Sequence, residues 1–157
     1  MKKALLFLLA AAFCFGQDEA KNNQGKFYRF DFAFKELDGG KAISQRNYSA
    51  IGNRFQSIMI RSGEKIPVSN IKSGENTYLD IGTNIDCRIQ QEKPDELQLY
   101  ITADASTANS LIPPVITQTK WSSDVVVPLK KPTILYSSDS ASKKTQTQLE
   151  ITVTPLQ

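Results

Sequence analysis

The sequence predicts an all-β domain, an antiparallel sandwich or a strongly curled sheet of about eight strands, and three observations indicate it. Apolar and polar residues alternate with a period of two through most of the chain after residue 26, as in strands that bury one face. Turn-forming clusters such as "DGG" and "EKPDE" separate these runs, and short connections favour antiparallel pairing. No segment shows the apolar spacing of a helix.

The first 16 residues, "MKKALLFLLAAAFCFG", have the order of a secretory signal peptide: two lysines, an apolar run and a small residue. The apolar run is too short for the ~20 residues that a membrane-spanning helix needs. We expect cleavage after Gly16, a flexible polar leader over residues 17–25 and a single β-domain over residues 26–157. Lipid modification of Cys14 is the alternative, although bulky Phe13 stands where the lipoprotein pattern has a small residue.

The first three predicted strands follow from the alternation. "FYRFDFAFKEL" places four aromatic side chains on one face: Tyr28, Phe30, Phe32 and Phe34. Asp38, Gly39 and Gly40 then predict a hairpin into residues 41–51. A third strand begins near Phe55 and continues through "EKIPV", where Pro67 indicates a sheet edge or a strand end because it lacks a backbone donor.

The stretch "TYLDIGTNIDCRI", residues 77–89, predicts one long strand that returns through residues 97–105 as a second hairpin. Cys87 falls on its apolar face and, as the only cysteine after the signal peptide, is expected to be buried. The final strands are "VITQTKWSSDVVVPL", "PTILYSS" and "TQTQLEITVTPL". Trp121 shares the parity of apolar Val125 and Val127, which predicts core or inter-sheet packing; the alternative is a stacking platform for a ligand.

Few residue patterns point to chemistry. The chain contains no histidine, which excludes serine–histidine and cysteine–histidine nucleophile systems. Asp80 and Asp86 share a strand face with Arg88, as on an ordinary solvated face. Removing Lys2 and Lys3 from the 19 basic residues leaves 17 against 16 acidic ones, so nothing favours binding to nucleic acid. We predict no enzymatic activity, no catalytic residues, no metal site and no cofactor.

Residues 55–155 resemble the C-terminal core of secretins, the outer-membrane channels of bacterial type II and III secretion and pilus systems. The resemblance lies in "SGEKIPV", "TYLDIG", "TNIDCRI", "ELQLYITADAS" and a closing "LEITVTP". Four motif residues match in order: Pro67, Tyr78, Asp80 and Gly82. It also implies that Gly82 marks a bend or bulge where a long strand changes direction.

The sequence departs from the secretin pattern in two places. "YSSDSASKK" stands where secretins have a glycine pair and an extended linker, and the ring-forming domains that precede the core in secretins are not seen before Phe55. The resemblance therefore implies a truncated, divergent relative: an accessory to a secretion or pilus secretin, or a degenerate one. It would be non-enzymatic, exported, and periplasmic or associated with the outer membrane.

Two alternatives remain, an oligomeric outer-membrane channel subunit and a periplasmic small-molecule-binding domain with Trp121 in a pocket. Arg29, Lys35 and Arg88 lie opposite the core faces, and a basic residue facing lipid costs ~2–4 kcal/mol at the bilayer midplane, which disfavours lipid contact. We expect a protein partner, or self-association, at an unpaired edge in the first strand or beside Ile66 and Pro67.

Overall fold

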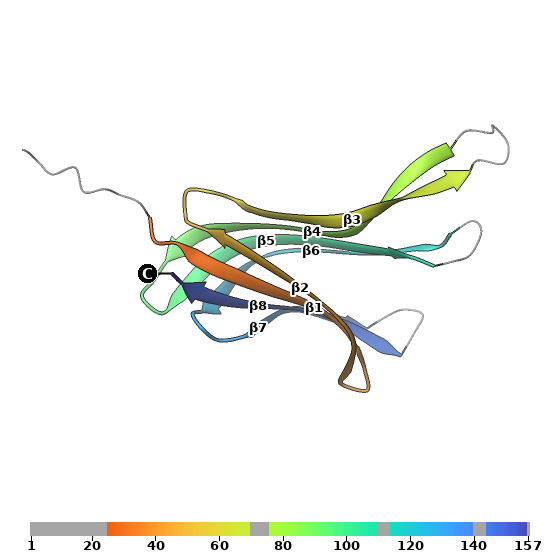
Figure 1. Cartoon of the computed structure of the whole chain (residues 1–157). Helices are drawn as coiled ribbons and strands as arrows, with labels where there is room; N and C mark the ends of the chain where they lie inside the picture. The colour runs from red at the N-terminus through yellow and green to blue at the C-terminus, as the bar shows by residue number, and fades with distance from the viewer. Residues whose placement is uncertain (1–24, 70–75, 110–113, 140–143, 157) are drawn as a thin grey trace, which may run out of the picture.

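The computed structural model describes residues 25–69, 76–109, 114–139 and 144–156; the predicted signal peptide and nearly all of the predicted leader lie outside these ranges. The described residues form eight strands and no helix (Figure 1). No described helix is long and apolar enough to span a bilayer. The strands are β1 (Tyr28–Asp38), β2 (Lys41–Gly52), β3 (Ile58–Ser69), β4 (Asn76–Glu92), β5 (Glu96–Ala108), β6 (Ile116–Pro128), β7 (Thr133–Asp139) and β8 (Thr145–Pro155).

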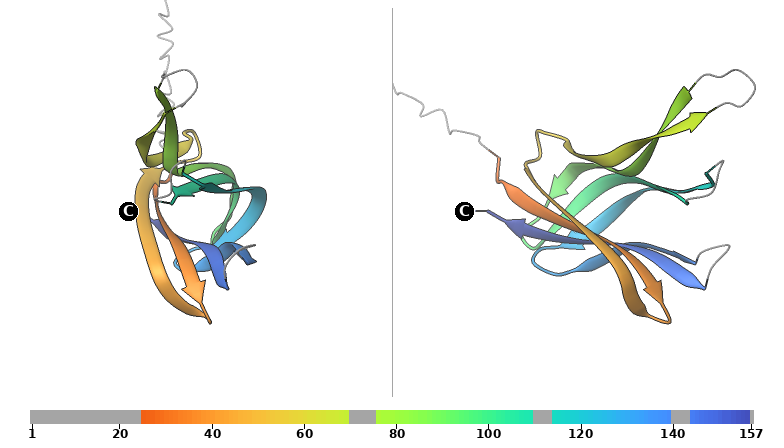
Figure 2. Two further views of the ribbon diagram at one scale, coloured as in Figure 1. Left: turned by 90° about the vertical axis from the view of Figure 1, so that its right-hand side faces the viewer. Right: turned by 45° about the vertical axis from the view of Figure 1, so that its right-hand side comes forward.

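These strands form two four-stranded antiparallel sheets, which confirms the predicted sandwich. Sheet A has the order β2-β1-β8-β7 and sheet B has the order β3-β4-β5-β6. The chain crosses from sheet A to sheet B between β2 and β3, and it returns between β6 and β7. Consequently β2 and β3 contact each other on one flank of the sandwich, and β6 and β7 on the opposite flank (Figures 1 and 2).

The inward faces of both sheets meet in one apolar core. Phe30 and Phe32 of β1 are fully buried, as are the inward residues of β5 and β8: Leu97, Leu99, Ile101, Leu149, Ile151 and Val153. Burying each such side chain stabilises the fold by roughly 1.5–3 kcal/mol. Cys87 lies in the same core at 1% exposure, as predicted, and burial raises the pKa of its thiol to about 12.

The strand order contradicts one of the two predicted sheet edges, that at the first strand, and agrees with the other, beside Pro67. An exposed edge at the first strand is wrong, because β1 pairs with β2 on one side and with β8 on the other. β3, which contains Pro67, is an edge strand of sheet B. The predicted hairpin between β1 and β2 is present, with Gly39 (φ 55°) and Gly40 (φ 82°) in the left-handed conformation that the turn requires.

Candidate functional site

Edge strand β3 has a neighbouring strand on one side only, and the hydrogen bonds of β4 show which β3 residues direct their backbone groups to the open side. The Gly82 N–H donates to Ser106 Oγ (3.0 Å), so it points from β4 towards β5. Gly82 lies opposite Gly63. Because N–H and C=O groups alternate between the two sides of a strand, Gly63, Lys65 and Pro67 direct theirs away from β4, towards the open edge. A proline is tolerated here because the N–H it lacks would have no partner within the sheet. Ile66, by contrast, directs its N–H towards β4.

Edge strand β6, at the opposite side of sheet B, follows the same rule. The Asn109 N–H donates to Val115 O (3.1 Å), which directs the odd-numbered residues of β6 towards β5. Even-numbered residues such as Lys120 therefore present their backbone groups to the edge. Pro128 falls among these edge-directed positions. On both edges of sheet B, the residues with free backbone groups carry side chains on the outer face.

Sheet A has two comparable edges. The Leu156 N–H donates to Phe27 O (2.8 Å), which continues the β1–β8 register and directs the even-numbered residues of β8 towards β1. Alternation along the register then directs Asn47 and Ser49 of β2 to one edge, and Ile134 of β7 to the other. These residues also face outwards. At all four edges, the residues whose backbone groups point to the open side thus carry their side chains on the outer face of the sandwich.

The motif glycine of β4 marks the point where two hairpins separate. The β4–β5 ladder ends at Thr83 and Ala105, whereas β3–β4 pairing continues to Ser69 and Asn76, and the β3–β4 hairpin turns away from β5 (Figure 1). Gly82 has φ 149°, which L side chains rarely adopt. A Cβ on Gly82 would overlap the backbone of β3. At the next position of the β4–β5 ladder, the Ser106 hydroxyl accepts a hydrogen bond from the Gly82 N–H, in place of a backbone carbonyl.

The other motif residues lie on this separated hairpin. Pro67 is opposite Tyr78, and Lys65 is opposite Asp80 with Nζ 3.8 Å from its carboxylate. Tyr78 is 62% exposed. Pro67, Tyr78, Asp80 and Gly82 therefore belong to one structural unit, the arm that projects beyond the core.

Polar groups on the outer face of sheet B pair with one another. Arg61 binds Asp86 at 2.6 Å, and the Ser122 hydroxyl donates to Tyr100 Oη at 2.9 Å, which lowers the pKa of Tyr100. These groups are exposed, and an exposed ion pair such as Arg61–Asp86 contributes only ~0–1 kcal/mol. Asp80, Asp86 and Asp104 of this face each lie within 4 Å of a neighbouring cation, as on a solvated face. No metal-binding cluster of histidine, cysteine or carboxylate residues occurs in the described part of the chain.

Trp121 occupies an inter-sheet position. It points inwards from β6, is half-buried against the core, and its ring lies 6.3 Å from that of Tyr136 on β7. Since β6 and β7 belong to different sheets, this contact joins the sheets at one flank. The geometry is that of packing, and Trp121 is not among the residues that line the polar hollow between the sheets.

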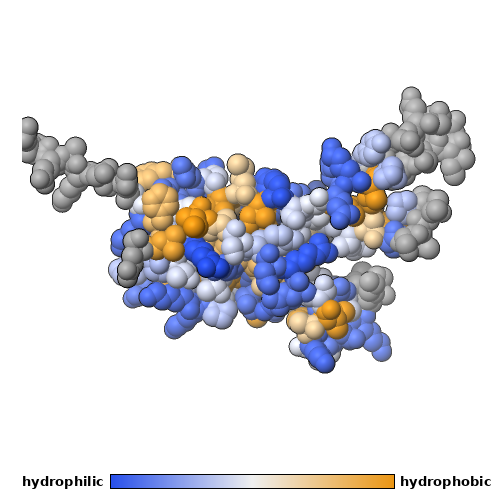
Figure 3. Space-filling view, in the orientation of Figure 1, coloured by the Kyte–Doolittle hydropathy of each residue, from blue (hydrophilic) through white to orange (hydrophobic). Residues whose placement is uncertain are grey.

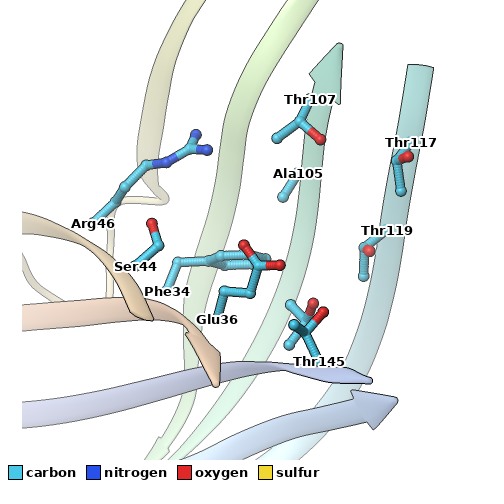
Figure 4. A pocket seen from close by; sticks show the side chains of 10 residues that line it. Phe34, Glu36, Ser44, Arg46, Ala105, Thr107, Thr117, Thr119 and Thr145 are labelled. Atoms are coloured by element: carbon cyan, nitrogen blue, oxygen red, sulfur yellow. The ribbon is translucent and has the colours of Figure 1, made fainter. Parts of the chain in front are cut away.

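A polar hollow lies where the two sheets separate (Figure 4). Along β1 the inward side chains change from Phe30, Phe32 and Phe34 to Glu36, and β2, opposite, brings in Arg46. The remaining wall is rich in hydroxyl groups: Ser44, Thr107, Thr117, Thr119, Thr145 and Thr147. The alternation of the sequence predicted the facing of these strands, but we did not predict the hollow.

Apolar side chains are exposed around the connection between β2 and β3. They are Phe27 (42% exposed), Ile51 (63%), Phe55 (62%) and Met59 (67%), and we call them the β2–β3 corner. The space-filling view shows apolar atoms gathered over this part of the molecule (Figure 3). The corner lies on the flank that carries two of the four sheet edges.

No protein-family model and no curated protein sequence matches the chain. Its fold matches a chain of the Klebsiella pneumoniae type II secretion system outer membrane complex of PulD, PulS and the PulC HR domain (TM-score 0.54, 8% identity, 84% of this chain and 39% of that chain). It also matches the type II secretin GspD of E. coli K12 (0.51, 10%, 84% and 48%). A third match is the InvG secretin domain β-barrel of the Salmonella SPI-1 injectisome (0.51, 8%, 84% and 62%).

The chain spans less than two thirds of the length of these matched chains. At 8–10% identity the likeness establishes the fold, which is that of a secretin C-terminal domain. The resemblance to the secretin core that the sequence predicted is therefore confirmed for the fold.

Proposed function

We propose that the protein is an exported, non-enzymatic secretin-fold domain that works by backbone pairing at its sheet edges, with further copies of itself as the partners. The single observation that carries the proposal is that, at all four edges, the residues with free backbone groups direct their side chains outwards. An unpaired edge is a template for a further strand, and all four edges present free N–H and C=O groups together with outward side chains.

The strand order allows both sheets to continue in one step. Each sheet has four antiparallel strands, so its two edge strands run in opposite directions. A second copy related by rotation would add β2 beside β7 and β3 beside β6, each in an antiparallel pair. Because the edge-directed residues on both flanks face outwards, the inward faces would remain inward across the junction. A head-to-tail contact of this kind closes into a ring when the rotation allows.

The β2–β3 corner supplies the apolar surface that such a contact needs. Ile51, Phe55 and Met59 lie on the flank that would be covered. Protein interfaces have apolar centres, and large exposed apolar patches mark interaction sites. Arg29 and Lys35 place charge on the outer face of β1. This charge disfavours lipid contact over β1 and favours an assembly that forms in the periplasm or beside the outer membrane.

Size-exclusion chromatography with light scattering on residues 17–157, without detergent, tests the proposal. We expect an assembly of several protomers whose mass falls on dilution. A monomer at all concentrations would overturn self-association.

A second candidate is an accessory domain that accepts a strand of another exported protein, because the Lys65 edge of β3 is open to any extended peptide. It predicts a monomer that gains one partner strand. Crosslinking from a photoreactive residue at position 65 in periplasmic extract would identify that strand, and crosslinks only between copies of this chain would exclude it.

A further inference from the structure

The polar hollow contains two charged side chains of opposite sign, Glu36 and Arg46, that have no partner among the residues the structure describes. Phe34 lies opposite Arg46, and Glu36 lies opposite Ser44, so Glu36 and Arg46 are diagonal neighbours on the inward face of sheet A. Diagonal neighbours on adjacent strands are ~7–8 Å apart, and their Cβ atoms are somewhat closer. Neither side chain forms a hydrogen bond or ion pair with the described residues. Figure 4 shows both extending into the same hollow.

The hydroxyl groups around these charges show the same pattern. Within the described ranges, the side-chain hydroxyl groups of Ser44 and of the five threonines of the hollow have no hydrogen-bond partner. On the outer face of sheet B the pattern is the opposite, since Arg61, Lys65 and Lys120 each bind a carboxylate. Ser44, Arg46, Thr107 and Thr117 are exposed, so the hollow is open to solvent and a ligand can reach its polar groups from outside.

We propose that this hollow binds a small zwitterion of the α-amino-acid type. Its carboxylate would accept hydrogen bonds from the Arg46 guanidinium, which binds carboxylates in bidentate geometry. Its ammonium group would donate to the Glu36 carboxylate. A zwitterion satisfies both fixed charges and leaves the net charge of the hollow unchanged, whereas a simple anion or cation satisfies only one.

The remaining walls indicate a small polar ligand. The hollow has a volume of about 140 Å³, below the ~300–1,000 Å³ of pockets for drug-sized ligands. Phe34 forms an apolar wall, and the threonines of β5, β6 and β8 offer hydroxyl groups opposite the two charges. A hydroxylated amino acid such as serine matches this combination of size and polarity.

Isothermal titration calorimetry on residues 17–157 tests the proposal with three matched probes. L-serine carries both charges, L-serinamide lacks the carboxylate, and N-acetyl-L-serine lacks the ammonium group. We expect saturable binding of L-serine and binding at least tenfold weaker for each of the other two, because each loses one charge-assisted interaction. Absence of saturable L-serine binding, or equal binding of all three probes, would overturn the proposal.

Two variants locate the site. Arg46→Gln and Glu36→Gln should each weaken L-serine binding about tenfold to a hundredfold. Arg29→Gln is the matched control, because Arg29 is an arginine on the outer face of the same sheet and should leave binding unchanged. Circular dichroism confirms that each variant is folded. Equal losses from Arg29→Gln and Arg46→Gln would reject this hollow as the site, and the probe comparison on the unmodified chain stands even if one variant does not fold.

Discussion

Gly63 and Gly82 face each other across the β3–β4 ladder with no room for a side chain on either residue. A Cβ on Gly82 would overlap Ser62 O and Gly63 Cα, and a Cβ on Gly63 would overlap Ile81 O. Their register lies one step beyond Thr83, the last residue that β4 pairs with β5. The glycine pair therefore allows two backbones to approach closely where the hairpin leaves the sheet.

Substitution of Gly82 should destabilise the fold, and valine should cost more than alanine. A residue held in a sparsely populated conformation costs ~1–3 kcal/mol, and here the overlap with backbone atoms adds to it. Chemical denaturation of Gly82→Ala and Gly82→Val measures the loss. Gly39→Ala is the control, because Gly39 also has positive φ but nothing lies within 4 Å of its Cβ position. If Gly82→Val were as stable as the unmodified chain, the strand would run straight at this residue.

Removing the Ser106 hydroxyl should weaken the same junction. Ser106→Ala leaves the Gly82 N–H without its acceptor in a half-buried position, at a cost of ~1–3 kcal/mol. Hydrogen exchange should show faster exchange of the Gly82 amide, with little change at Ile101 in the core. Ser122→Ala, on the exposed outer face, serves as the control. An unchanged Gly82 exchange rate would show that water replaces the hydroxyl without loss.

Burial of Cys87 predicts both its reactivity and a pH dependence. The thiol pKa is raised to about 12 in the folded chain from 9.0, so the unfolded chain loses this proton first as the pH rises. The contribution to stability is complete below pH 9 and is lost between pH 9 and 12, at up to ~1.4 kcal/mol per pH unit. Unfolding curves at pH 8 and 10 should therefore differ more for the natural chain than for Cys87→Ala. Maleimide should label Cys87 only after denaturation, and rapid labelling of the native chain would contradict its burial.

The alternation of apolar and polar residues predicted which face of each strand is buried, but it did not predict which strands lie side by side in a sheet. Phe30 and Phe32 identify the inward face of β1, but a period of two contains no information on which strands lie beside it, and β1 proved central. Pro67 was a better indicator because a missing N–H constrains hydrogen bonding, which is a lateral property.

The hollow escaped sequence analysis for a related reason. Glu36 shares the parity of Phe34, and Arg46 shares that of Tyr48, so both were assignable to the inward face. Charged residues normally indicate solvent, and only the divergence of the two sheets makes an inward charge tolerable. That divergence depends on how sheet A, in which β1 pairs with β8, packs on sheet B, which contains β5, and these strands are far apart in the sequence.

Proline substitutions at adjacent residues of β3 should separate edge pairing from folding. Lys65 directs its N–H to the open edge, so Lys65→Pro should reduce self-association while changing the unfolding free energy by less than ~1 kcal/mol. Ile66→Pro removes an N–H directed at β4 and should destabilise the fold by ~1–3 kcal/mol. Lys65→Ala controls for loss of the exposed contact with Asp80. Assemblies that survive Lys65→Pro would exclude this edge as a contact.

A second proline, Lys120→Pro on β6, tests whether the contact joins opposite flanks. Lys120 also directs its N–H to an edge, and its contact with Asp104 is exposed on the lysine side. In a head-to-tail assembly, Lys65→Pro disables one flank and Lys120→Pro disables the other, so each variant alone should give smaller species in light scattering. Mixed together, the two variants keep one intact pair of flanks and should form heterodimers that do not grow further. If each junction instead used the same flank of both copies, one of the two variants alone would still form homodimers and mixing would add no new species, which would contradict the head-to-tail contact.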